Sequence, residues 1–133
     1  MAEFPNKSDR IAIAVGLEHW REGETTLSVD SSGQAEITNR RSGELTRFDG
    51  FVTSEQLSDL SKVVGAIVPL QRENKPRKPD DVPLKISLIA GDEVTLQNNA
   101  FWYGDRYSVP EVNQVIRLFN QMVKQISNGA IST

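Results

Sequence analysis

The sequence contains no cysteine and a single histidine, His19, among its 133 residues. The absence of cysteine excludes a disulfide framework, a thiolate nucleophile, an iron–sulfur cluster and any zinc site built on cysteine. With one histidine, neither a His-x-x-x-His zinc helix nor a Ser–His–Asp triad around a second histidine can form. We therefore interpret His19 as a solvent-exposed turn residue and expect no metal site.

Other motifs that carry chemistry are also missing. The sequence has no Gly-Lys-Ser/Thr phosphate loop, no Gly-x-Gly-x-x-Gly and no Gly-x-Ser-x-Gly nucleophile elbow. Its acidic doublets, Asp80-Asp81 and Asp92-Glu93, are adjacent residues in predicted loops. A glycosidase instead needs two carboxylates that face each other across a cleft. We therefore expect no enzymatic activity, no catalytic residue and no cofactor.

Long apolar runs and excess positive charge are absent as well. No apolar run approaches the roughly 20 residues that span a bilayer. The segment Met1–Lys7 is polar and lacks the apolar stretch of a signal peptide. We expect a cytoplasmic protein, or a mature chain whose signal was removed, without a membrane partner.

The net charge of −3 and the isoelectric point of about 5.2 give no general attraction to nucleic acid. Arg40, Arg41 and Arg47 form a local basic group. Because no aromatic stacking platform or RNP-like sequence accompanies this group, the sequence argues against a nucleic-acid partner.

The length is close to the commonest domain size, so we predict one domain over residues 1–133 with disordered tails at 1–9 and 129–133. Apolar and β-branched residues then alternate in four segments separated by turns about ten residues apart. This rhythm is typical of an antiparallel meander. The predicted strands cover residues 10–17, 25–29, 34–39 and 45–52.

The second half of the chain contains two predicted helices. Thr53 and Gln56 have the spacing of a capping box, and the helix that they begin ends at Pro69. A hairpin over 84–89 and 94–97 follows, and then an irregular aromatic segment over 100–107. The last helix begins at a second predicted capping box, Ser108 and Glu111. Its apolar stripe consists of Val112, Val115, Ile116, Phe119, Met122, Val123 and Ile126.

The resulting element order is ββββ-α-ββ-α. A helix with one apolar face must cover another apolar surface. We therefore predict an α+β fold in which two helices pack on one face of a mostly antiparallel sheet.

Two surface features are candidates for partner binding. In the aromatic segment Phe101-Trp102-Tyr103 we expect Phe101 in the core, and Trp20 and Trp102 are the large residues that the core accommodates least. The charged loop over 70–83 supplies cations that would steer association. The alternatives are that Trp102 is core and that the loop is merely solvated. The predicted partner-binding residues are Trp20, Trp102, Tyr103, Arg72, Arg77 and Lys78.

Four segments share a pattern of strands, turns and helix starts: Thr25–Gly33, Gly50–Leu57, Leu84–Asp92 and Val109–Val112. This pattern resembles emfourins, small bacterial protein inhibitors of thermolysin-like metalloproteases. The similarity covers about residues 25–126 and carries no inhibitory residue. The Gly-rich opening expected of emfourins is reduced here to Gly16 and Gly23.

The resemblance implies a protein inhibitor whose partner is a thermolysin-like metalloprotease. Two other roles remain open from the sequence. One is a structural or adaptor domain of a bacterial or phage assembly, or an immunity-type protein. The other is an enzyme without a recognisable motif. We expect the protein-binding role because the chain lacks catalytic motifs.

Overall fold

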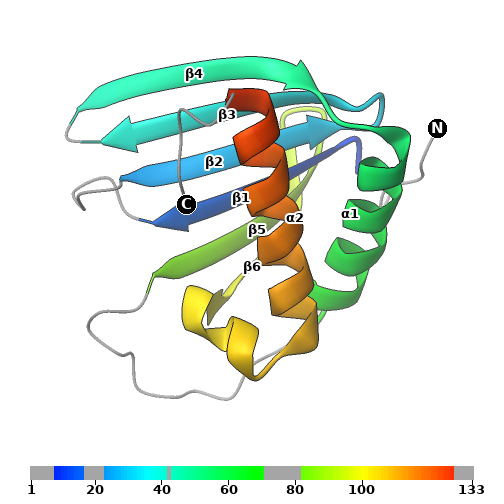
Figure 1. Ribbon diagram of the computed structural model, residues 1–133. Helices are drawn as coiled ribbons and strands as arrows, with labels where there is room; N and C mark the ends of the chain where they lie inside the picture. The colour runs from blue at the N-terminus through cyan, green and yellow to red at the C-terminus, as the bar shows by residue number, and fades with distance from the viewer. Residues whose placement is uncertain (1–7, 17–22, 42, 71–81, 128–133) are drawn as a thin grey trace.

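The computed structural model describes residues 8–16, 23–41, 43–70 and 82–127. They form an antiparallel sheet of six strands, with two α-helices on one of its faces (Figure 1). This arrangement confirms the predicted α+β fold and its ββββ-α-ββ-α order. The elements are β1 Arg10–Gly16, β2 Glu24–Asp30, β3 Gln34–Arg41, β4 Glu44–Phe51, α1 Ser54–Ile67, β5 Pro83–Ala90, β6 Glu93–Trp102, the 3-10 helix η2 Tyr103–Tyr107, and α2 Pro110–Ser127.

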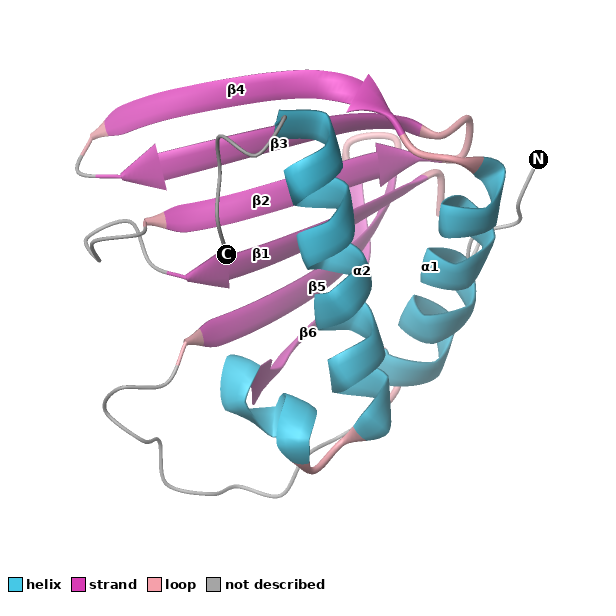
Figure 2. Ribbon diagram, viewed as in Figure 1, coloured by secondary structure: helices cyan, strands magenta, loops and turns pink. Residues whose placement is uncertain are grey.

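The strands lie in the spatial order β4-β3-β2-β1-β5-β6. The first four form a meander, and α1 carries the chain from β4 at one edge back to β5 on the far side of β1 (Figure 2). Every neighbouring pair is antiparallel. The sheet therefore has two edges, β4 and β6.

The alternation seen in the sequence separates the two faces of the sheet. Ile13 of β1 opposes Leu27 of β2 on one side and Ile86 of β5 on the other, and all three are buried beneath the helices. Burying one such side chain stabilises the fold by about 1.5–3 kcal/mol. The opposite face bears small and polar residues, including Ala12, Thr26, Ser28 and Ser87.

Helix α1 begins as predicted. The Gln56 amide donates to the Thr53 hydroxyl at 3.1 Å, and the Thr53 amide donates to Gln56 Oε1 at 2.9 Å. Gln56 Nε2 also donates to Gln125 Oε1 on α2 at 3.0 Å. Gln56, the third residue of α1, therefore ties the start of one helix to the end of the other.

Helix α2 buries the predicted stripe except for Ile126, which is half-buried. The helix begins differently from the prediction. The Asn113 amide donates to the Val109 carbonyl, which makes Val109 the N-cap and Pro110 the first helical residue. The predicted capping box at Ser108 was wrong. The Ser108 hydroxyl donates instead to the Asp105 carbonyl at 3.4 Å, because Ser108 ends the preceding 3-10 turn.

Strand β6 is longer than the predicted 94–97 and continues to Trp102. The prediction ended the strand before Asn98 because a polar residue breaks the apolar alternation. In the structure Asn98 lies on the helix-covered face of β6 and is only 7 % exposed. Its Nδ2 group lies within hydrogen-bonding distance of the carbonyls of Ile67, Val68 and Leu70, at 2.8–3.3 Å. These carbonyls lie at the last residue of α1 and just beyond it, where helical partners are missing. Asn98 therefore acts as a C-terminal cap for α1.

Most of the two predicted tails lies outside the described residues. Asp9 is described, and its amide donates to the Ile89 carbonyl at 2.9 Å while its carbonyl accepts from the Ser31 amide. Asp9 is thus hydrogen-bonded to segments at one end of the sheet.

Within the described ranges, no helix is both long and apolar enough to cross a membrane.

The turn between β2 and β3 depends on the carboxylate of Asp30. Partial burial would raise the pKa of Asp30, but hydrogen bonds from the Ser32 hydroxyl and amide and from the Gln34 amide outweigh it, with help from the charge of Arg10. The net effect is a pKa below the ordinary value. The ionised carboxylate therefore stabilises the folded state.

The burial of α2 predicts that Phe119→Ala lowers the free energy of unfolding by about 3–5 kcal/mol, since Phe119 is 0 % exposed. Urea unfolding followed by circular dichroism measures this loss. The control is Gln121→Ala on the exposed face of the same helix, which should change stability by no more than about 0.5 kcal/mol. A loss below about 1 kcal/mol for Phe119→Ala would show that α2 is peripheral.

The Asp30 carboxylate predicts a pH-dependent loss of stability in Asp30→Asn. Because the folded pKa is depressed, the charge stabilises the fold above the unfolded pKa of about 3.9 and stops doing so as the pH falls through the folded value. The stability difference between wild type and variant should be largest near neutral pH and should shrink in acid. Urea unfolding at a series of pH values tests this, and a difference that is constant with pH would contradict it.

Candidate functional site

The aromatic segment forms a surface cluster where β6 passes into η2. The Arg106 guanidinium lies 4.2 Å from the ring centroid of Tyr103 and 4.2 Å from that of Tyr107. Its Nη1 donates to the Tyr103 carbonyl at 2.9 Å, and its Nη2 donates to the Tyr107 hydroxyl at 2.6 Å. We call Tyr103, Arg106 and Tyr107 the aromatic–arginine cluster.

The backbone of this cluster is fixed at its start. The Tyr103 amide donates to the Val82 carbonyl at 2.7 Å, and the Trp102 amide donates to Asp105 Oδ2, also at 2.7 Å. Asp105 is only 6 % exposed. Its carboxylate therefore makes a charge-assisted hydrogen bond in a sheltered position, where such bonds are strong. The strand end and the 3-10 turn are held together by this contact.

Helix α2 and the following chain fix the rest of the cluster. Asn120 of α2 donates from Nδ2 to the Tyr103 hydroxyl at 3.3 Å. The Asp105 carbonyl accepts from the amides of Ser108 and Val109 at 3.0 and 2.8 Å. The 3-10 turn is thus joined to β6, to the segment before β5 and to α2, so the cluster is presented on a rigid support.

The exposure of the cluster decides what it can do. Tyr107 is 81 % exposed, whereas Tyr103 and Arg106 are half-buried. Stacking of the guanidinium restricts the Arg106 side chain before any partner arrives, which lowers the entropy that binding would cost. The cluster offers aromatic ring surface, a phenol and a fixed cation. These are the residue types in which the binding energy of protein interfaces is concentrated.

The structure brings together only part of the predicted site. Tyr103 lies in the cluster, Trp102 precedes it along the chain, and neither is fully buried. Phe101 is 4 % exposed and packs in the core, as predicted. The other predicted partner-binding residues lie outside the described part of the chain: Trp20, Arg72, Arg77 and Lys78.

Sequence reasoning missed Arg106, although a signal was present. Tyr103 and Arg106 are three residues apart, and side chains at this spacing eclipse each other in a 3-10 helix. Recognising the signal requires knowing that residues 103–107 form such a helix. The sequence pattern predicts irregular structure for this segment instead.

No family model and no curated protein sequence matches this chain. The assignment of the site therefore depends on the geometry of the described residues.

Two further surface features compete with the cluster. An open groove of about 820 Å³ lies between α1 and α2, and its walls carry both acidic and basic side chains, including Asp59, Lys62, Glu111 and Arg117. A smaller polar depression of about 210 Å³ lies on the uncovered face of the sheet. Neither lining includes an aromatic residue. We place the candidate site at the cluster because, among these three features of the described chain, it alone combines an exposed aromatic with a fixed arginine.

The support of the cluster predicts that Asp105→Ala lowers the free energy of unfolding by about 1–3 kcal/mol, because the substitution removes the acceptor of a sheltered hydrogen bond. Chemical denaturation measures the loss. Asp59→Ala, which removes an exposed carboxylate from α1, is the control and should cost no more than about 0.5 kcal/mol. Equal effects of the two substitutions would show that Asp105 does not hold the turn.

Proposed function

We propose that this chain is a protein-binding module that inhibits a thermolysin-like metalloprotease. The observation that carries the binding role is the aromatic–arginine cluster, in which a rigid 3-10 turn presents Tyr107 at 81 % exposure beside the fixed cation of Arg106. Tyrosine and arginine are among the residues in which the binding energy of interfaces is concentrated. The class of target is supported by the resemblance of residues 25–126 to emfourins.

The way in which the cluster is built fits inhibition by occlusion. A protease cleaves a segment that can open locally and extend into its cleft. Residues 103–107 are instead bonded to Val82, to Asn120 and within their own turn, and these contacts oppose local opening. A turn of this kind would occupy a protein surface and would not be cut quickly. The inhibitor would therefore act stoichiometrically and remain intact.

The energetic roles within the cluster differ. Tyr107 supplies most of the accessible ring surface, so its truncation should remove the largest share of binding energy. Arg106 holds the Tyr107 hydroxyl and stacks on its ring, so it positions Tyr107 as well as offering charge. Tyr103 is half-buried and mainly supports the turn through its bond to Asn120.

The proposal predicts stoichiometric loss of protease activity when active-site-titrated thermolysin-like enzymes are mixed with the chain. Activity is followed on a protein substrate, and gel electrophoresis shows whether the chain remains intact. Tyr107→Ala should weaken inhibition by about 30-fold, corresponding to a contact worth about 2 kcal/mol. The tyrosine is exposed, so its loss should leave the fold intact.

The matched control is Val94→Ala, which removes exposed apolar surface from the other end of β6, where Val94 is 55 % exposed. This variant should inhibit as wild type does. If no enzyme of a thermolysin-like panel loses activity, the metalloprotease target is wrong. If Tyr107→Ala inhibits as strongly as wild type, the chain is an inhibitor but the cluster is not its binding site.

A further inference from the structure

The two edges of the sheet differ in regularity. Strand β4 pairs with β3 in one unbroken register, from Gln34 opposite Phe51 to Arg41 opposite Glu44. Strand β6 at the other edge pairs with β5 through two register shifts. Irregular pairing protects an edge from adding another strand, and so do proline and lysine. Strand β4 contains neither of these residues. Within the described part of the chain, no other strand pairs with its outer edge.

The backbone orientation of β4 identifies the groups at this edge. The Val52 amide donates to the Gly33 carbonyl at 2.9 Å, so Val52 faces β3. Orientation alternates along an antiparallel strand. The amides and carbonyls that face away from β3 therefore belong to Leu45, Arg47, Asp49 and Phe51.

The side chains of these residues lie on the sheet face that the helices do not cover. Leu45 is 57 % exposed and Phe51 is 71 % exposed. Arg47 and Asp49 lie between them, with side chains 60 % and 66 % exposed. The open edge thus presents the sequence apolar, basic, acidic, apolar. Read in the opposite direction, the order is apolar, acidic, basic, apolar. Two antiparallel copies of this row therefore place opposite charges against each other and apolar residues against each other.

We propose that β4 is a homodimer interface in which a second copy of this chain adds its own β4 antiparallel to the first. The two-fold axis passes between Phe48 and the partner's Phe48. In this register Arg47 opposes the partner's Asp49, and Leu45 opposes the partner's Phe51. Each pair occurs twice by symmetry. All outward-facing residues of β4 therefore meet a side chain of matching chemistry.

The neighbouring registers are excluded by charge. Sliding the partner by two residues places Arg47 opposite Arg47 in one direction and Asp49 opposite Asp49 in the other. Directly opposed like charges destabilise a strand pair, whereas opposite charges and apolar pairs stabilise it. A slide by a single residue would place side chains on the wrong face. The register centred on Phe48 is the one that the side chains select.

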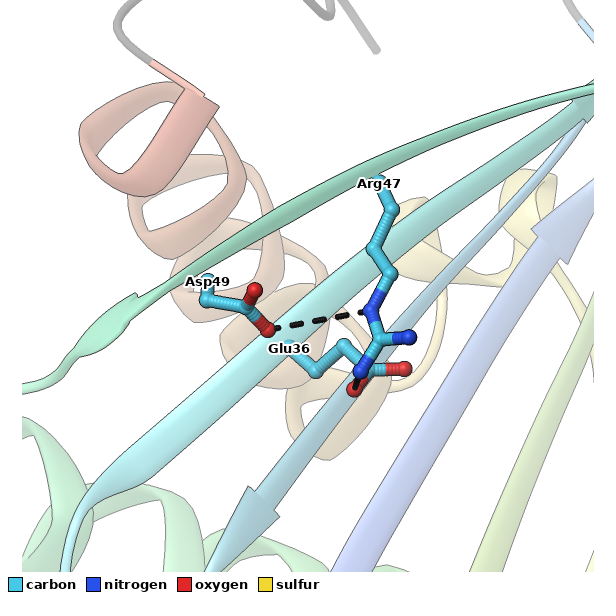
Figure 3. Close-up of polar contacts among 3 residues, drawn as sticks. All are labelled: Glu36, Arg47 and Asp49. Atoms are coloured by element: carbon cyan, nitrogen blue, oxygen red, sulfur yellow. Dashed lines mark hydrogen bonds and ion pairs between the residues drawn. The ribbon is translucent and has the colours of Figure 1, made fainter.

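The contacts within one chain prepare this pairing. Arg47 Nη2 lies 2.6 Å from Glu36 Oε2 on β3, which draws the guanidinium over the uncovered face (Figure 3). Arg47 Nε lies 3.8 Å from Asp49 Oδ1, which is too long for a hydrogen bond. The Asp49 carboxylate is therefore held only weakly by Arg47 of its own chain. The Asp49 carboxylate can therefore accept a hydrogen bond from the partner's Arg47, while each Arg47 keeps its bond to Glu36 of its own chain.

The proposed dimer leaves the aromatic–arginine cluster accessible. The cluster follows β6, which is the edge opposite to β4. Joining two β4 strands would make one continuous sheet with a cluster near each outer edge. The dimer does not depend on the proposed inhibitory role, and its test does not use a protease.

Charge reversal provides the test. Wild type, Arg47→Asp and Asp49→Arg are examined by sedimentation velocity from micromolar to millimolar concentration. Wild type should shift with concentration toward twice the mass of one chain. Each single variant should dimerise at least about tenfold more weakly, because each creates two like-charge pairs across the axis. An equimolar mixture of the two variants should restore the dimer, since two acidic side chains on one β4 then face two basic side chains on the other.

A dimer that is restored in the mixture also shows that the single variants are folded. The matched control is Lys85→Asp. Lys85 is exposed on β5, so reversing its charge changes the same uncovered face away from the β4 edge. This variant should dimerise as wild type does. The proposal is overturned if wild type stays monomeric at all concentrations, if the single variants dimerise normally, or if their mixture remains monomeric.

Discussion

The fold depends on the double pairing of β1. This strand bonds to β2 on one side and to β5 on the other, so it is the only link within the described sheet between the meander of β1 to β4 and the hairpin of β5 and β6. Ile11 and Ile13 lie on its helix-covered face at 0 % exposure. Both helices pack over the seam between the two halves of the sheet (Figure 1). Loss of this pairing would therefore divide the core as well as the sheet.

The regular parts of this fold could be predicted because local patterns and the final packing agree. Strand alternation and the stripe of α2 each identify the face that becomes buried, and the Thr53 capping box formed as expected. The end of β6 was missed because a polar side chain there has a distant partner. Asn98 reads as the end of a strand, yet it is buried because it caps a helix that ends about thirty residues earlier. No local pattern contains that contact.

The candidate site shows the same division. The aromatic residues Trp102 and Tyr103 could be found from composition and from the limited space in the core. The position of Arg106 could not, because it depends on a 3-10 turn that Asn120, Val82 and the Asp105 carboxylate hold in place. Sequence reasoning thus identifies residues that resist burial. Tertiary contacts decide which of them are fixed, and a fixed group is the one that can bind with little entropic cost.

The two edges of the sheet show how the same architecture can serve two kinds of contact. At β6 the ladder is irregular and the chain turns directly into η2, so this edge presents side chains on a rigid turn. At β4 the ladder is regular, so this edge presents backbone groups with an ordered row of side chains. Backbone groups bond to any strand, and selectivity must therefore come from the side chains. The order of Leu45, Arg47, Asp49 and Phe51 provides it, because another copy in one register satisfies both its charges and its apolar ends.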